Sequence, residues 1–393
     1  NPSQGITYDT ALYKATVNVT WTDGVGLSNT VTYEKLDADS QWVALESSGE
    51  VKFTNTYTAI GSWTPEGTKT LTGRDMKADE TYTFSVREVP TGNGQNPGDD
   101  SSEGTVASTG SVTGGTDGQS SNITFTPINY TLSDVGTHTY IITEDITDEI
   151  KEAGYKSNGV VYDDTQYTVT VEVTDNGDGT LNIVPQYPSG GVQFTNKYEP
   201  TSIHYAPSVT KNLTGHWLPN ATGTKNFVFT LQAVQNPDNG AVLPEDAELT
   251  VTINGKTNEA TATNSGTFDE ITFTKAGTYT FTIAEKAVAG DTGYTYDEAQ
   301  WTLTVTVTDD GNGNLSFNGT PVYASNQDGV DENATGAVFT NNYQPVSTTA
   351  NLKVSKAVEG SPMPQAETFT FVQSLESGNA SGVQMPANNQ AQI

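Results

Sequence analysis

The sequence has no cysteine and only three histidines among its 393 residues. Disulfides and thiolate metal sites are therefore excluded, and the histidines are too few and too scattered for a His-rich zinc centre. Cations are scarce too, because 17 Lys and Arg face 47 Asp and Glu, giving a formal net charge of −30. Such an acidic surface repels phosphate backbones and anionic lipid, so we expect no nucleic-acid partner.

Long apolar runs and enzyme motifs are also missing. No stretch of about 18 apolar residues exists, so no membrane insertion is predicted for this segment. The sequence contains no phosphate-binding Gly-Lys-Ser/Thr loop, no GxGxxG and no GxSxG. We therefore expect no enzyme with multiple turnover, no cofactor and no metal. Because the chain starts without Met or a signal peptide, we expect it to be an internal part of a longer array.

The composition that is present suits β-sheets. Hydrophobic residues make up only 34 % of the chain, and its 18 tyrosines and many threonines favour pleated, half-exposed strands. Apolar and polar residues alternate over short segments bounded by turn residues, which is typical of β-sandwiches. We expect at most one helical turn, around residues 145–153, where this alternation breaks.

Internal repeats divide the chain. A Phe-Thr-Asn-x-Tyr run occurs three times and places an asparagine at Asn55, Asn196 and Asn341. A Tyr-Asp pair opens an alternating segment three times, at Tyr8, Tyr162 and Tyr296. A lysine followed four residues later by glycine also occurs three times, at Lys69, Lys211 and Lys356. Repeats of this kind indicate a row of similar domains.

The repeats predict an all-β fold of tandem Ig-like β-sandwich domains arranged end to end as a rod. Residues 58–199 and 200–343 form two complete units. Residues 1–57 are the last strands of a preceding unit, and residues 344–393 are the first strands of a following one. Two insertions rich in Gly, Ser, Asn and Asp, at residues 92–118 and 319–336, are expected to be surface loops.

The two-residue period of the strands predicts three polar side chains in each core. Residues two apart share a face of a strand, and this rule places a Lys, a Glu and an Asn among apolar neighbours in both complete units. The sets are Lys69, Glu144 and Asn196, and Lys211, Glu285 and Asn341. An unpaired buried charge costs several kcal/mol, so we expect each set of three to meet.

If they meet, a specific reaction becomes available. Burial lowers the pKa of a lysine and raises that of a glutamate. A neutral Lys amine can attack the Asn side-chain carbonyl carbon, while a protonated Glu hydrogen-bonds to the carbonyl oxygen and relays protons to the departing ammonia. The product is a Lys–Asn isopeptide bond, formed once per domain. Two alternatives stay open: a plain buried ion pair beside a capping Asn, and Asp163 or Asp297 as the acid in place of Glu.

The incomplete ends carry single members of this set. Asn55 and Lys356 are the isopeptide residues of incomplete repeats, and neither end contains the strand that would bring its Glu. We therefore expect no bond between Asn55 and Lys356. Two turns, at residues 175–179 and 309–313, resemble calcium loops. They lack the bidentate Glu of an EF-hand and lie between strands, so we expect hairpin turns.

Together, Lys-x-Φ-x-Gly, the Ile-x-Glu strand end, Tyr-Asp and Phe-Thr-Asn-x-Tyr resemble the isopeptide-forming domains of Gram-positive pili and adhesin stalks, of the streptococcal major-pilin type. The resemblance implies bonds Lys69–Asn196 and Lys211–Asn341, with Glu144 and Glu285 as catalytic acids. It also implies an extracellular stalk or fibre at the bacterial cell surface, with further repeats of the fibre as partners and any host protein or glycan bound at a tip outside this chain. The alternative is an adhesin module that recognises host matrix protein or glycan through the inserted loops.

Overall fold

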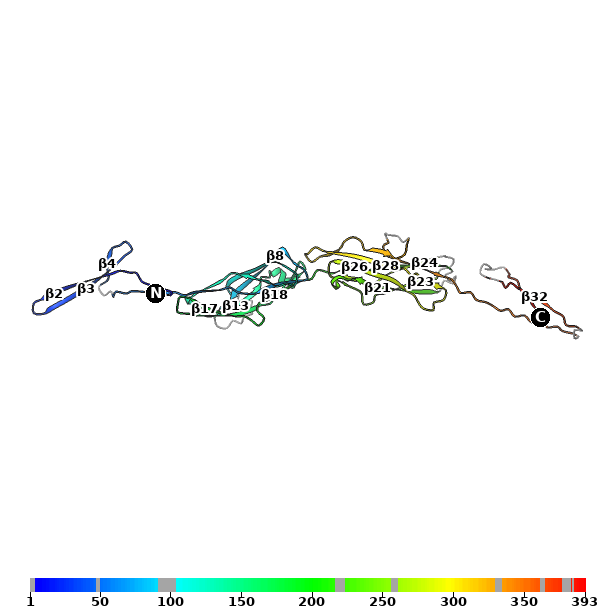
Figure 1. Ribbon diagram of the computed structural model, residues 1–393, viewed down its shortest axis with the longest axis horizontal. Helices are drawn as coiled ribbons and strands as arrows, with labels where there is room; N and C mark the ends of the chain where they lie inside the picture. Colours follow the sequence, from blue (N-terminus) through cyan, green and yellow to red (C-terminus); the bar gives the residue numbers. More distant parts are fainter. Residues whose placement is uncertain are drawn as a thin grey trace.

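The structure is a computed structural model that describes residues 4–46, 50–90, 104–215, 223–255, 261–328, 334–360, 365–376, 383 and 385–393. Nearly all its regular elements are β-strands, as predicted. Two β-sandwich bodies lie in a row along the long axis, with thinner segments continuing the row at either end (Figure 1). Among the described residues, no helix is long and apolar enough to cross a membrane.

The first body, whose strands run from Ile60 to Tyr198, is built from two sheets and a short strand pair. One sheet has the order β10-β7-β18-β15-β14, the other β11-β9-β8-β13-β16-β17, and β12 pairs with β6. The strands are β6 (Ile60–Trp63), β7 (Thr68–Thr72), β8 (Met76–Glu88), β9 (Val106–Gly115), β10 (Ser121–Asn122), β11 (Thr124–Phe125), β12 (Ile128–Thr131), β13 (Gly136–Glu144), β14 (Lys156–Ser157), β15 (Val160–Val161), β16 (Tyr167–Asp175), β17 (Leu181–Gln186) and β18 (Gln193–Tyr198). A 3-10 turn η1 (Leu132–Asp134) and a single helical turn α1 (Asp148–Glu152) complete it. The latter confirms the helical turn expected around residues 145–153.

The second body, whose strands run from Ile203 to Tyr343, has a similar plan. Its sheets have the orders β24-β20-β31-β27, β23-β21-β26-β28-β29 with β30 on β28, and β19-β25-β22. The elements are β19 (Ile203–Tyr205), β20 (Ser208–Gly215), β21 (Thr224–Gln235), η2 (Pro237–Asn239), β22 (Ala241–Val242), β23 (Glu248–Asn254), β24 (Thr261–Thr267), β25 (Ile271–Phe273), β26 (Gly277–Lys286), β27 (Tyr294–Thr295), β28 (Gln300–Asp309), β29 (Leu315–Phe317), β30 (Val322–Ser325) and β31 (Ala337–Tyr343).

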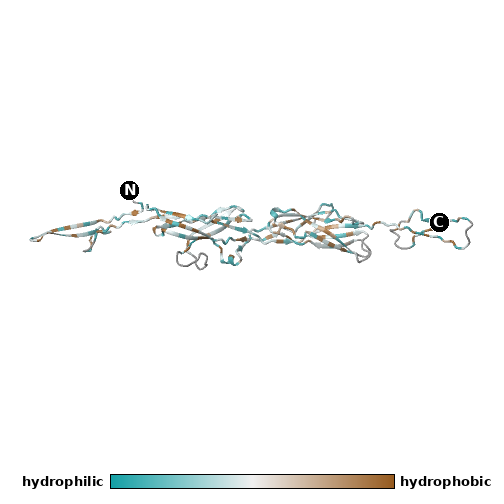
Figure 2. Cartoon of the chain, turned by 90° about the horizontal axis from the view of Figure 1, so that it is seen from below, coloured by the Kyte–Doolittle hydropathy of each residue, from teal (hydrophilic) through white to brown (hydrophobic). Residues whose placement is uncertain are grey.

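Each body has its own hydrophobic core between its sheets. Alternation of buried and exposed residues along β16 and β28 follows the period-2 sequence pattern. An aromatic pair joins the sheets in both bodies: the ring centroids of Phe84 and Phe194 lie 5.1 Å apart, and those of Phe229 and Phe339 lie 4.9 Å apart. Figure 2 shows hydrophobic and hydrophilic residues interleaved along these strands.

The first and last long strands of each body are parallel neighbours. β7 pairs with β18 in a register that sets Lys69 opposite Phe194, and β20 pairs with β31 in a register that sets Lys211 opposite Phe339. The facing sheet contributes the central strand, β13 or β26. Glu144 is the last residue of β13, and Glu285 is the last but one of β26. Two sheets therefore hold the Lys and Asn on one side of the core and the Glu on the other.

The end segments contain small separate sheets and strand pairs. Residues 4–57 hold β1 (Ile6–Thr7), β2 (Tyr13–Thr22), β3 (Gly26–Leu36), β4 (Trp42–Ala44) and β5 (Thr56–Tyr57), with the sheet β2-β3-β4 and the pair β1-β5. Among the described residues of this segment, no hydrophobic side chain is buried. Beyond residue 344, β32 (Thr370–Val372) pairs with β33 (Gln390–Gln392).

Parts of the two expected surface loops are strands, and there the loop prediction was wrong. Residues 106–115 form β9 inside the six-stranded sheet, and residues 322–325 form β30 against β28. In β9 a glycine has a packing role, because a Cβ on Gly110 would lie 2.5 Å from a ring carbon of Phe125. In β30, Tyr323 is 2 % exposed and anchors the strand. Residues 92–103 and 329–333 of these insertions lie outside the described residues.

Candidate functional site: a buried Lys–Glu–Asn cluster in each unit

In the first body, Lys69, Glu144 and Asn196 meet in the core. Lys69 Nζ donates to Glu144 Oε2 at 2.6 Å, and Asn196 Nδ2 donates to Glu144 Oε1 at 2.8 Å. Both Lys69 and Asn196 are fully buried. One carboxylate therefore bridges the lysine amine and the amide nitrogen of the asparagine.

The second body repeats this arrangement. Lys211 Nζ donates to Glu285 Oε2 at 2.9 Å, and Asn341 Nδ2 donates to Glu285 Oε1 at 2.9 Å. The side chains of Lys211 and Glu285 are both 0 % exposed. The structure thus brings together all three predicted residues in each complete unit, in the same pairing.

The carbonyl oxygen of each asparagine has a different partner from the one we expected. The backbone N–H of Asp163 donates to Asn196 Oδ1 at 2.8 Å, and that of Asp297 donates to Asn341 Oδ1 at 2.7 Å. A backbone N–H can only donate, so it fixes the amide with oxygen toward Asp and nitrogen toward Glu. The expectation that Glu hydrogen-bonds to the carbonyl oxygen was wrong.

The carboxylates of the Tyr-Asp pairs brace the backbone. Asp163 Oδ2 accepts the N–H of Thr195 at 2.7 Å, directly before Asn196, and Asp163 Oδ1 accepts the N–H of Thr165 at 3.0 Å. Asp297 accepts the N–H of Thr340 at 2.6 Å in the same way. These contacts bind the Asp carboxylates to the backbone, whereas Glu144 and Glu285 contact both the amine and the amide, which favours Glu over Asp as the group between them.

The same brace occurs in the incomplete end segment. The N–H of Asp9 donates to Asn55 Oδ1 at 3.0 Å, and Asp9 Oδ2 accepts the N–H of Thr54 at 2.8 Å. Asn55 is exposed, and Lys356 is exposed beside the ring of Phe369, 4.9 Å from its centroid. These two residues belong to segments at opposite ends of the row, so the structure does not bring them together (Figure 1).

Burial sets the electrostatics of both clusters. It lowers the pKa of Lys69 and Lys211, that of Lys211 to about 8, against the opposing attraction of the neighbouring glutamate. It raises the pKa of Glu144 and Glu285 against the attraction of the lysine. Each Nζ also faces an aromatic ring at 4.7 Å, Tyr82 in the first body and Phe227 in the second. Both shifts favour a neutral amine beside a protonated carboxyl.

The two Asp-rich turns are hairpins, as predicted. Residues 175–179 connect the antiparallel strands β16 and β17, and residues 309–313 connect β28 and β29. Asp175 and Asp309 accept backbone N–H groups of Gly177 and Gly311 within their own turns. Each turn also receives a tyrosine hydroxyl from the preceding part of the chain, Tyr57 or Tyr198, a contact that was not predicted from the sequence. The signal was present in the repeated Tyr of the Phe-Thr-Asn-x-Tyr run.

Comparison with solved structures gave pilins at low similarity. The major pilin of Streptococcus pyogenes is 18 % identical, with 72 % of this chain and 98 % of that chain covered and a TM-score of 0.23. The T-13 major pilin of the same species is 16 % identical, with 73 % and 99 % covered and a TM-score of 0.24. The minor pilin GBS52 of Streptococcus agalactiae is 10 % identical, with 73 % and 99 % covered and a TM-score of 0.17. Comparison with curated protein sequences gave no match.

Comparison with protein families gave a match over most of the chain. The family FctA, described as a Spy0128-like isopeptide containing domain, matches residues 1–58, 65–199 and 207–344. The three matched regions each end at a Phe-Thr-Asn-x-Tyr run, and two of them contain a complete Lys–Glu–Asn cluster. The resemblance stated from the sequence motifs is thereby confirmed, and the chain belongs to the family of Spy0128-like isopeptide-containing domains.

Proposed function

We propose that this chain is part of the structural stalk or fibre of a bacterial cell-surface pilus or adhesin, and that each complete unit is closed by an autocatalytic Lys–Asn isopeptide bond. The bonds are Lys69–Asn196 and Lys211–Asn341. The observation that carries the proposal is the buried cluster in which one glutamate touches both the amine and the amide nitrogen, in two copies.

The geometry supports separate roles for the Lys, the Asp backbone and the Glu in the reaction. The neutral Lys amine attacks Cγ of the asparagine, and negative charge develops on Oδ1, where the Asp163 or Asp297 backbone N–H already donates. Glu144 or Glu285 takes a proton from the attacking nitrogen and delivers one to Nδ2, with which it is hydrogen-bonded. One C–N bond forms, one breaks, and one ammonia leaves. The glutamate ends in its starting state, but the bonded unit cannot react again, so this is not turnover.

The strand arrangement suits a load-bearing module. Parallel neighbours β7 and β18, or β20 and β31, stand at the beginning and the end of each unit. A covalent bond between such strands would pass tension from one to the other and shield the intervening strands from unfolding. The row of bodies in Figure 1 fits a stalk built from further repeats of the same fibre.

We also propose units at residues 58–199 and 200–343, flanked by parts of further repeats at 1–57 and 344–393. Their separate hydrophobic cores support the two complete units. The proposed location is extracellular, at the Gram-positive cell wall, and host protein or glycan would be bound at a tip outside this chain. The adhesin alternative relies on the two insertions as recognition loops, and residues 106–115 and 322–325 of these insertions belong instead to the sheets.

Single-molecule stretching tests the mechanical role. The full chain is pulled between its ends, and we expect neither complete unit to add contour length, because tension passes through the bonded strands. The variant Asn341→Ala should add one extension step that corresponds to the second unit. Extension of both units in the unmodified chain would contradict the stalk proposal.

A further inference from the structure

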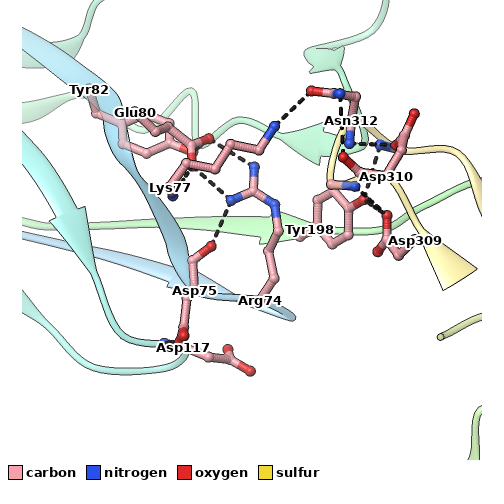
Figure 3. A network of polar contacts seen from close by, with 12 residues as sticks. Arg74, Asp75, Lys77, Glu80, Tyr82, Asp117, Tyr198, Asp309, Asp310 and Asn312 are labelled. Atoms are coloured by element: carbon pink, nitrogen blue, oxygen red, sulfur yellow. Dashed lines mark hydrogen bonds and ion pairs between the residues drawn. The ribbon is translucent and has the colours of Figure 1, made fainter. Parts of the chain in front are cut away.

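The last-strand tyrosines contact the next unit through their hydroxyl groups. Tyr198 donates to Asp309 Oδ1 at 2.7 Å and accepts the N–H of Gly313 at 3.0 Å (Figure 3). Tyr57 makes the same pair of bonds one unit earlier, to Asp175 Oδ1 at 2.8 Å and from Gly179 N–H at 3.2 Å. Each hydroxyl is thus held by both a donor and an acceptor of the same hairpin turn.

Two glycines face each other at both of these junctions. A Cβ on Gly159 would lie 2.6 Å from Gly313 Cα, and a Cβ on Gly5 would lie 2.6 Å from Gly179 Cα. All four glycines have φ between +78° and +90°, the left-handed region that favours glycine. The hairpin turn of one unit and the loop end of the unit before it therefore approach more closely than any side chain would permit.

The connecting residues are bonded to both sides of the junction. Glu199 N–H donates to Gly159 O at 2.7 Å in the preceding unit, and Thr201 N–H donates to Gly313 O at 2.9 Å in the following one. At the earlier junction, Thr58 N–H donates to Gly5 O at 2.9 Å and Ile60 N–H donates to Gly179 O at 3.2 Å. Because the backbone is held on either side of a single residue, these connections are not free linkers.

Two cationic side chains of the preceding unit make further contacts at the later junction. Lys77 Nζ donates to Asn312 Oδ1 at 2.7 Å, and the Arg74 guanidinium lies 4.6 Å from the centroid of the Tyr198 ring. Arg74 is itself held by Glu80, as Figure 3 shows. Lys77 therefore places one positive charge beside the Asp-rich turn of the following unit, and a complementary charge of this kind favours one docking orientation.

We propose that the Asp-x-Gly-x-Gly hairpin turn of each unit is a docking site for the C-terminal pole of the preceding copy of the same repeat, and that this Tyr–Asp junction fixes the orientation of successive units. The pole is defined by the last-strand tyrosine and by the glycine that precedes the Tyr-Asp pair, Gly159 with Tyr198 or Gly5 with Tyr57. The proposal concerns contacts between units and does not depend on isopeptide formation within them.

The glycine of the C-terminal pole occurs a third time in the chain, in the second unit. Gly293 stands three residues before Tyr296, as Gly159 does before Tyr162, and its φ of +86° matches. Gln344 N–H donates to Gly293 O at 2.7 Å, the counterpart of the Glu199–Gly159 bond. The second unit therefore presents the same glycine geometry at its C-terminal pole, where a further copy of the repeat would dock.

A distance measurement across the later junction tests the proposal. Because the chain has no cysteine, the exposed positions Glu172 and Thr302 can each be changed to cysteine (Glu172→Cys and Thr302→Cys) in the full chain and spin-labelled. Pulsed dipolar spectroscopy then gives the distribution of distances between the two units. We expect one narrow peak in the parent chain, and loss of that peak to a broad distribution with Tyr198→Phe or Gly313→Ala.

Matched controls come from the other junction. Tyr57→Phe and Gly179→Ala make the same chemical changes one unit earlier, and they should leave the measured peak unchanged. Gly313→Ala could broaden the distribution by disturbing its own turn. Tyr198→Phe removes only the hydroxyl and keeps the ring, so its result alone shows whether the Tyr–Asp contact fixes the orientation of the units. A broad distribution in the parent chain, or an unchanged narrow peak with Tyr198→Phe, would overturn the proposal.

Discussion

The backbone N–H of Asp163 and the side-chain oxygen of Asn196 are 2.8 Å apart, and Asp297 and Asn341 repeat the contact at 2.7 Å. This donor lies where charge develops when an amine attacks the amide carbon. The carboxylate of the same aspartate holds the N–H of Thr195, one residue before Asn196. In the proposed reaction, a single residue would therefore both polarise the amide under attack and position the strand that carries it.

Loss of the Asp163 side chain should slow bond formation in the first unit alone. Asp163→Ala removes the brace, so the backbone donor and the Asn196 strand are held less well. We expect a slowing of about tenfold, equivalent to ~1.4 kcal/mol of transition-state stabilisation. The assay starts from protein that is recovered unfolded, before any isopeptide bond has formed. The protein is then refolded, and the rate of ammonia loss is measured by mass spectrometry.

Three comparisons separate this role from a merely structural one. The second unit, with Asp297 intact, is the internal control and should react at the parental rate. Asp163→Asn, which keeps an acceptor oxygen, should recover part of the rate. An ester in place of the amide N–H at residue 163 should slow the reaction further than Asp163→Ala. If the ester variant reacts at the parental rate, the backbone donor has no catalytic role.

Bond formation in the second unit should have a bell-shaped pH profile. The reactive pair has a neutral Lys211 and a protonated Glu285, so it must hold one proton. Burial lowers the pKa of Lys211 to about 8 and raises that of Glu285. Above about pH 8 the pair loses its proton and the acid is gone, whereas below the pKa of Glu285 the amine stays charged and cannot attack.

The refolding rate assay across pH 4 to 10 checks this profile. We expect the rate to fall on both sides of a maximum, and Glu285→Gln to abolish bond formation in the second unit while the first unit still reacts. A rate that rises continuously with pH would indicate that amine deprotonation alone controls the reaction, against the proton relay proposed for the glutamate.

Removal of the bond should destabilise a unit strongly. Cross-linking the first and last strands closes a loop of more than about 100 residues, which stabilises the folded state by about 5 kcal/mol in the loop-entropy model. Asn196→Ala should therefore lower the melting temperature of the first unit and expose it to trypsin, and Asn341→Ala should do the same to the second. Unchanged melting and digestion would mean that the cluster is only a packed polar contact.

The end segments should not cross-link to one another. Lys356 and Asn55 are exposed on opposite end segments, and neither segment contains a counterpart of Glu144. We therefore expect the chain to run as a monomer on a denaturing gel. Covalent dimers containing a Lys356–Asn55 peptide would contradict this expectation and would show that the reaction proceeds without the glutamate.

The period-2 rule, applied to repeated segments, was enough to select the residues of the cluster. Lys69, Glu144 and Asn196 stand out because charged and amide side chains are rare on apolar strand faces, and a second copy repeats them. The Asp163 donor could not be predicted in this way, because a backbone N–H is common to almost every residue type and leaves no mark in the sequence. The same limit explains the misassigned partner of the Asn196 oxygen.

The missed strands have a different cause. The segment 106–115 is rich in Gly, Ser and Thr, which signal a turn when read locally. Packing decided otherwise, since Gly110 leaves room for the Phe125 ring and Val112 enters the core. The tyrosine–turn contacts between units were missed because they join residues more than 100 positions apart, as for Tyr198 and Asp309.

Intact-mass measurement of the folded and then denatured chain tests the central claim most directly. Two isopeptide bonds predict a mass below that of the sequence by two ammonia molecules. Glu144→Ala should restore one of them and leave the Lys211–Asn341 bond in place. A mass equal to that of the sequence would show that neither cluster reacts, and the isopeptide account of this protein would be wrong.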